Sequence, residues 1–231
     1  MRSFTITAIT KQRLNQSDYL LVAANLVPVF GVWLEGWSAK EAFIVYALET
    51  IIMGVLTVIK LGIAAFYRKT DWWYNNNTVT RVPALLFILF FILHFGLFVA
   101  VQSSLFAATA NVNPPGTGIL YFFTHWYTFV NPEVGFMLAA FIVGYAANDL
   151  LPFVVHRDYK YVSMMRLMFQ PYGRIFIQQF IVILGSMFLA LGMDKIFILV
   201  FALVKIFFVV YLHIDKIINR TTARLEKESG K

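Results

Sequence analysis

Long apolar runs recur along this 231-residue chain, and they constrain its fold more than any other feature. Hydrophobic residues make up 60% of the sequence and charged residues only 13%, which lies outside the usual composition of a soluble domain. Runs of about 18 or more apolar residues are typical of transmembrane helices, because about 20 helical residues cross the hydrocarbon core of a bilayer. The sequence therefore predicts an all-α, polytopic integral membrane protein, folded as a bundle of transmembrane helices.

Six spans are expected, with polar segments at both ends. Residues 1–18 are predicted to form a cytoplasmic N-terminal segment, residues 19–217 the membrane domain, and residues 218–231 a basic cytoplasmic tail. The predicted spans cover about residues 19–37, 42–66, 82–107, 135–155, 175–192 and 196–217.

Lysine and arginine are unevenly distributed among the connections between these spans. The expected loop of residues 67–81 and the loop of residues 156–174 are basic, whereas the connection of residues 108–134 contains no lysine or arginine. The positive-inside rule then places both termini and both basic loops in the cytoplasm, in a multi-pass protein of the plasma membrane. The same distribution explains the net charge of +7 by topology and attraction to lipid headgroups, so nucleic acid is not an expected partner.

Ionisable residues inside the spans are the candidate functional groups, because a charge in hydrocarbon is costly and usually faces a partner or a wet cavity. Glu49 and Lys60 share one face of the second span, about 20° apart and about 16 Å apart along the helix axis, so each needs a partner from another span. One predicted buried polar cluster contains Glu49, His94 and Lys205. A second, inner cluster contains Lys60, Asp149, Gln179 and His213.

Structural interpretations of these residues stay open beside the functional ones. Glu49 and Lys205 would also form a buried ion pair that fixes helix register. Lys60 and Asp149 lie close enough to the cytoplasmic edge to snorkel or to cap a helix. A metal or haem site built from His94, His213 and Glu49 is a third interpretation.

No enzyme motif is complete in the sequence. It has no HExxH, no histidine pair at i and i+4, no glycine-rich phosphate loop and no GxSxG. Cysteine is absent, which excludes disulfides, thiolate metal sites and cysteine nucleophiles. The sequence therefore does not favour an enzyme, and it identifies no cofactor.

Five segments carry a family pattern when they are taken together. They are NLVPVFGVWLEGW (25–37), YALETIIMGVLTVIKL (46–61), FFILHFGLFVAVQ (90–102), FQPYGRI (169–175) and LVKIFFVVYLH (203–213). In combination they resemble a family of uncharacterised six-span prokaryotic membrane proteins, known only as a domain of unknown function.

The resemblance implies a metal site in the family, because its members often carry two further histidines and an aspartate. The corresponding positions of this chain are Gln102, Gln179 and Val209, whereas Glu49, His94, Lys205 and His213 match the family pattern. By this comparison, a metal site of the family would be lost in this chain.

Three functions follow from these observations. The preferred one is a scaffold or accessory subunit with a buried polar cluster, acting in the bilayer as a homo-oligomer or in a larger membrane complex. The second is a proton-coupled or ion-conducting carrier that uses Glu49, His94 and Lys205, since histidine and a buried carboxylate are common parts of a proton relay. The third is an intramembrane metal- or haem-binding enzyme.

Overall fold

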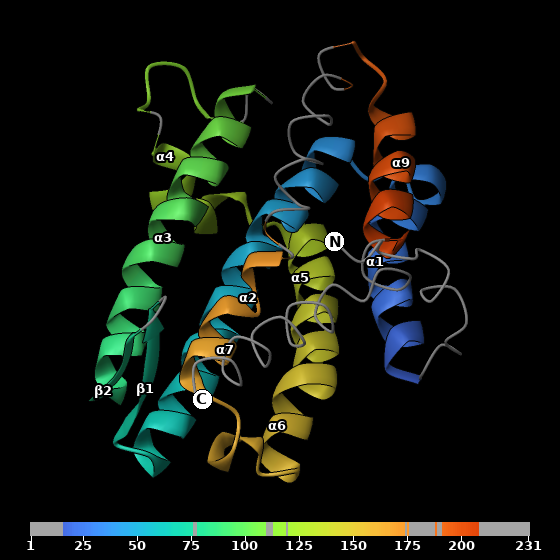
Figure 1. Cartoon of the computed structure of the whole chain (residues 1–231). Helices are drawn as coiled ribbons and strands as arrows, with labels where there is room; N and C mark the ends of the chain where they lie inside the picture. The colour runs from blue at the N-terminus through green and yellow to red at the C-terminus, as the bar shows by residue number, and fades with distance from the viewer. Residues whose placement is uncertain are drawn as a thin grey trace, which may run out of the picture.

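The computed structural model describes residues 16–75, 78–109, 113–118, 120–173, 175, 188 and 191–207. These residues are mostly helical, and the longer helices run side by side as a bundle (Figure 1). The helices of the first half are α1 (Gln16–Leu34), α2 (Ala39–Tyr67) and α3 (Ala84–Thr109). Those of the second half are α4 (Tyr121–Thr124), α5 (Pro132–Tyr145), α6 (Leu151–Val155), α7 (Met164–Phe169) and α9 (Asp194–Ile206). The described residues also form three shorter helical turns, η2 (Trp126–Phe129), η3 (Ala146–Leu150) and η4 (Asp158–Lys160).

Three helical stretches of the described chain are long and apolar enough to cross a membrane. They are Ile44–Tyr67, Ala84–Ser104 and Pro132–Val155, and the last of these runs through α5, η3 and α6. The helical nature of the second, third and fourth predicted spans is thereby confirmed. Within α1, a shorter apolar stretch covers Asn25–Leu34. The fifth predicted span, residues 175–192, and the end of the sixth lie almost entirely outside the described residues.

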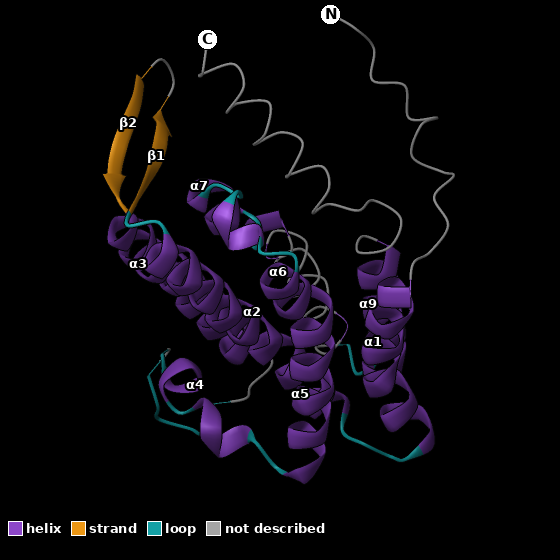
Figure 2. Cartoon of the chain, turned by 90° about the horizontal axis from the view of Figure 1, so that it is seen from below, coloured by secondary structure: helices purple, strands orange, loops and turns teal. Residues whose placement is uncertain are grey.

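The expectation of an all-α chain is wrong between α2 and α3, where a loop was predicted. Strands β1 (Thr70–Asn75) and β2 (Thr78–Pro83) pair there as an antiparallel hairpin. Threonine, valine and aromatic residues favour extended backbone on both sides of an asparagine-rich stretch of the sequence. The N–H of Ala84 donates to the carbonyl of Lys69 at 2.9 Å and closes the base of the hairpin. Figure 2 shows the hairpin in orange at one end of α3.

Helix α2 lies at the centre of the fold, because it contributes to both hydrophobic clusters of the described residues. One cluster joins α2 to α1, α5 and α9, and the other joins it to α3 and α7. Gly54 permits the contact with α3, since a Cβ atom there would lie 2.5 Å from Cε1 of Phe95. The polar residues of α2 are therefore enclosed between helices on two sides.

Candidate functional site

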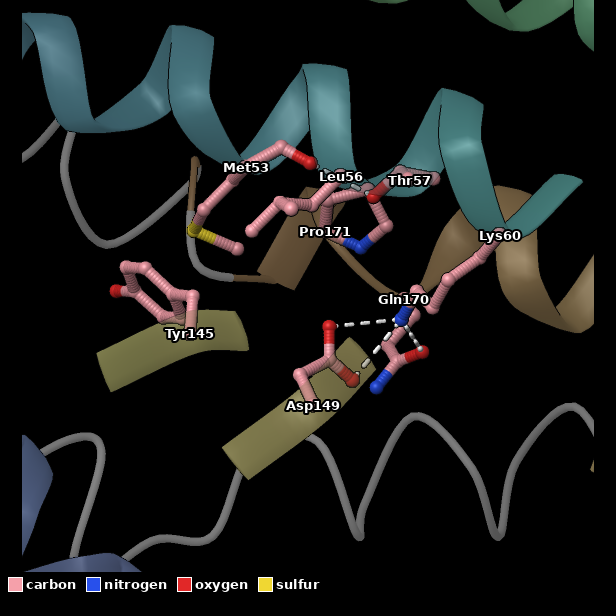
Figure 3. Close-up of a pocket in the computed structure, with 8 residues that line it drawn as sticks. All are labelled: Met53, Leu56, Thr57, Lys60, Tyr145, Asp149, Gln170 and Pro171. Carbon is pink, nitrogen blue, oxygen red and sulfur yellow. Dashed lines mark hydrogen bonds and ion pairs between the residues drawn. The ribbon is translucent and has the colours of Figure 1, made fainter. Parts of the chain in front are cut away.

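Lys60 is a cation buried in the second half of α2. Its side chain is only 3% exposed. The ammonium group donates to both carboxylate oxygens of Asp149, at 2.9 and 2.8 Å, and to the amide oxygen of Gln170 at 3.2 Å (Figure 3). An ammonium has three protons, so these three acceptors satisfy it fully. Lys60 therefore does not snorkel to the surface, which was one of the interpretations open from the sequence.

Asp149 reaches Lys60 from a π-helical turn. This turn, η3, separates α5 from α6, and Pro152 is the second residue of α6. Proline has no N–H to donate to the carbonyl of Asn148 four residues earlier, which favours a local departure from α-helical geometry. Such π-helical turns are frequent at functional sites. The side chain of Asp149, in the Pro132–Val155 helix, thereby reaches Lys60 of α2.

Gln170 is held in place by helix α7. The side chain of Ser163 caps the start of α7 by accepting from the N–H of Arg166 at 3.2 Å. The buried carboxylate of Asp71, in strand β1, accepts from the N–H of Met164 at 2.7 Å. Gln170 follows α7 directly, so the hairpin and α7 together position the amide that contacts Lys60.

The ion pair lies at the wall of a polar cavity of about 220 Å³. A smaller space of about 10 Å³ is lined by the same pair, and Figure 3 shows the side chains around it. One water needs a cavity with roughly 10–15 Å³ of accessible volume. The smaller space therefore suits a single water, and the larger one suits several waters or a small organic solute. The polar cavity is lined by Lys60, Asn148, Asp149, Pro152, Phe153, Asp158, Val162, Arg166, Leu167 and Gln170.

Glu49 lies in the first half of α2, before Lys60, and has different neighbours. Its side chain is buried, and the hydroxyl of Tyr145 donates a hydrogen bond to it. Tyr46, one turn before Glu49, is also buried, and its hydroxyl donates to the carbonyl of Asn25 at 2.9 Å. Because Tyr145 precedes Asp149 by one helical turn, the α5–η3 helix contacts both Glu49 and Lys60 of α2.

His94 lies on an exposed part of α3, among aromatic rings. Its Nδ1 atom is 2.7 Å from the hydroxyl of Tyr172, and its ring stacks on Phe90 with centroids 5.3 Å apart. Burial raises the pKa of the Tyr172 phenol to about 12, so the hydroxyl keeps its proton at neutral pH. A protonated phenol can donate to a neutral imidazole or accept from a charged one, so the contact is compatible with both forms of His94.

The structure brings some of the predicted site residues together. Lys60 and Asp149 of the inner cluster are in direct contact. Glu49 contacts Tyr145 and His94 contacts Tyr172, and these two tyrosines belong to different hydrophobic clusters. Gln179, His213 and the side chain of Lys205 lie outside the described residues, so their places in the two clusters stay predictions.

No group of three or more histidine, aspartate or glutamate side chains that could hold a metal ion occurs within the described part of the chain. Gln102 is buried in α3. The metal interpretation, which needs His213, therefore gains no support from the residues that can be placed.

Sequence reasoning missed Tyr145 and Gln170. Tyr145 carried a usable signal, because it precedes Asp149 by four residues and so lies on the same face of a helix. Gln170 lies in the FQPYGRI segment, which contributed to the family resemblance but was not assigned to either predicted cluster. The remaining polar residues of the cavity, Asn148, Asp158 and Arg166, come from elements that converge only in the folded chain.

Together these features define a class: a mostly helical protein with helices suited to cross a membrane and a charged pair buried between them. Comparison with protein families is more specific. The chain belongs to the Family of unknown function (DUF6498), which matches residues 8–227. No curated protein and no solved structure matches the chain.

Proposed function

We propose that this protein is a multi-pass carrier that moves a small polar solute or an ion across the membrane. The observation that supports it best is the Lys60–Asp149 pair, a buried ammonium and a partly exposed carboxylate at the wall of a polar cavity. Ionisable residues in membrane-spanning helices are costly, and they commonly mark substrate paths and proton relays. The cavity supplies the space that such a path needs.

The asymmetry of the pair suggests how it would work. The Asp149 side chain is 32% exposed, whereas that of Lys60 is 3% exposed. A proton or a cationic group arriving through the cavity would therefore meet Asp149 first and weaken its hold on Lys60. The lysine would then need another acceptor, which favours a rearrangement of α2 against η3. Glu49 and Tyr145 would form the next polar group along the same two helices.

The proposal also includes the finer topology. The apolar runs support six spans, and the lysine and arginine distribution supports the placement of both termini in the cytoplasm. Basic residues of the connections, among them Lys69, Arg81 and Arg157, belong to the end of the bundle that carries the hairpin, α6 and α7 (Figure 1). That end is therefore proposed to face the cytoplasm, in the plasma membrane. Relative to the sequence-based carrier hypothesis, Lys60 and Asp149 join Glu49, His94 and Lys205 as candidate residues.

Flux through the purified protein in liposomes tests the carrier function. A trapped pH-sensitive dye would report proton movement under an imposed potential, first alone and then with amino acids, small organic acids and small organic cations added singly. We expect flux with the unmodified protein and little with Asp149→Asn or Lys60→Met. Lys160→Met is the matched control, because Lys160 contacts the ring of Tyr67 rather than an acid.

The double variant Lys60→Met/Asp149→Leu separates a functional pair from a structural one. Replacing a buried ion pair with apolar residues often preserves stability. A stable double variant without flux would support the carrier. Full flux in the double variant would show that the pair is only structural. Absence of flux from the unmodified protein under every condition would return the scaffold or accessory-subunit hypothesis to first place.

A further inference from the structure

The hairpin has two chemically different faces. Opposite residues of an antiparallel pair point to the same face, so Asp71, Trp73, Thr80 and Val82 share one face. Trp73 packs on Phe87 and Phe90 of α3, with ring centroids 5.3 and 5.4 Å apart. This inner face attaches the hairpin to the bundle.

Asp71 also attaches the inner face of the hairpin to the rest of the bundle. Its carboxylate is buried, accepts from the N–H groups of Trp72 and Met164, and lies 3.2 Å from the guanidinium of Arg68. Arg68 also donates to the carbonyl of Val162. The hairpin is therefore anchored to α3 and to the start of α7, and the charges of Arg68 and Asp71 offset each other.

The outer face combines an indole with a cation. Trp72 and Arg81 lie opposite each other, and the guanidinium carbon is 5.9 Å from the centre of the indole ring. The Nε of Arg81 donates to the hydroxyl of Thr70 at 2.8 Å, which orients the guanidinium. Trp72 is 47% exposed and Val79, on the same face, 39% exposed. Lys69, at the base of the hairpin, is exposed as well.

The position of this face limits what can cover it. The hairpin joins the ends of two helices that are suited to cross a membrane, Ile44–Tyr67 and Ala84–Ser104. It therefore belongs to the region where hydrocarbon meets water. Tryptophan and arginine with an apolar neighbour suit that region, because an indole settles at the headgroup level and a cation attracts anionic lipid. Arg81 gives this face a positive charge, and Lys69, exposed at the base of the hairpin, adds a second cation close by, since the carboxylate of Asp71 is committed to the inner face.

We propose that the outer face of the hairpin binds the headgroups of anionic phospholipids in the membrane. Arg81 and Lys69 contact lipid phosphates, and Trp72 inserts beside them at the level of the headgroups. This inference rests on the membrane-spanning part of the proposed function and is independent of the carrier activity.

Lipid-dependent thermal stability of the full chain in detergent tests the proposal. Phosphatidylglycerol or phosphatidylcholine is titrated into the micelles, and the unfolding midpoint is followed as a function of lipid concentration. We expect phosphatidylglycerol to raise the midpoint of the unmodified protein more than phosphatidylcholine does. In Lys69→Gln/Arg81→Gln, the phosphatidylglycerol concentration for half-maximal stabilisation should rise about 30-fold, from about fivefold per basic residue at an anionic surface.

Two further variants keep the test decisive. Lys195→Gln removes an exposed cation at the start of α9, away from the hairpin, and should leave the lipid response unchanged. Arg81→Lys keeps the charge and should retain most of the lipid selectivity, so it serves if the double variant fails to fold. Equal responses to both lipids, an unchanged response in Lys69→Gln/Arg81→Gln, loss of lipid selectivity in Arg81→Lys, equal loss in Lys195→Gln, or equal stabilisation by inorganic phosphate would each overturn the proposal.

Membrane extraction separates this inference from the proposed function. If alkaline carbonate releases the protein from membranes, then the membrane-spanning arrangement is wrong and both proposals fail. If the protein is retained and selects phosphatidylglycerol but shows no flux, then only the carrier function fails.

Discussion

Removing Asp149 should destabilise the protein more than removing Lys60. Both substitutions break the same ion pair, but they leave different groups behind. Lys60→Met leaves a carboxylate whose side chain is 32% exposed at a polar cavity, where water can solvate it. Asp149→Leu leaves an ammonium that is 3% exposed, with Gln170 as the remaining acceptor of the three.

The expected magnitudes follow from this difference in exposure. An uncompensated buried charge costs about 3–5 kcal/mol, which we expect for Asp149→Leu. Loss of hydrogen bonds to a charged group costs about 1.5–3 kcal/mol, which we expect for Lys60→Met because Asp149 can rehydrate. In a chain of 231 residues, 1 kcal/mol shifts the midpoint by about 2–4 °C, so a difference of about 2 kcal/mol should separate the variants by about 4–8 °C. The double variant Lys60→Met/Asp149→Leu should return close to the unmodified protein.

Thermal unfolding of the four proteins in one detergent, followed by tryptophan fluorescence, measures this cycle. The reasoning would be refuted if Lys60→Met were the more damaging single variant, or if the two losses simply added in the double variant. Additive losses would mean that the residues do not interact in the folded protein.

Two other substitutions test contacts of α2. Tyr145→Phe removes the hydroxyl that donates to Glu49, so the free energy of unfolding should fall by about 1.5–3 kcal/mol; an unchanged midpoint would argue against that hydrogen bond. Gly54→Ala should cost about 1–3 kcal/mol, because the added Cβ atom meets Phe95 at 2.5 Å. Gly62→Ala, where the Cβ atom meets open space, should instead be neutral or stabilise by up to about 1 kcal/mol, and equal effects of the two alanines would contradict the packing described.

The length of the apolar runs predicted the long helices but not the hairpin. The predicted spans 42–66 and 82–107 agree with α2 and α3, because hydrophobicity marks a membrane-length helix strongly. The hairpin between them is short, and its strands show no strict alternation of polar and apolar residues, since Trp72 and Trp73 occupy both faces. Its detectable signal was local: two runs rich in β-favouring residues around asparagines.

The sequence could predict which ionisable residues belong to the candidate site, but not which side chains they contact. The cost of burying charge identified Glu49, Lys60 and Asp149 from the sequence alone. Their partners depend on how α2 crosses the α5–η3 helix and on the π-helical turn, and neither can be derived from one helix at a time. A helical side chain also leans toward the N-terminus, so the ammonium of Lys60 reaches back along α2 toward Thr57, and both residues line the smaller space beside Asp149.

Helix α7 connects the hairpin to the buried ammonium, and Asp71 is the contact that can be tested. The carboxylate of Asp71 accepts from the N–H of Met164 at the start of α7, and Gln170 at its end accepts from Lys60. Asp71→Ala leaves that N–H without its acceptor and the guanidinium of Arg68 without its carboxylate partner, so α7 should open more readily. Amide hydrogen exchange should therefore accelerate across residues 164–170 and stay unchanged in α5, with Asp158→Ala as a control that removes a carboxylate of η4. Unchanged protection of α7 in Asp71→Ala would show that the helix is held by its apolar contacts alone.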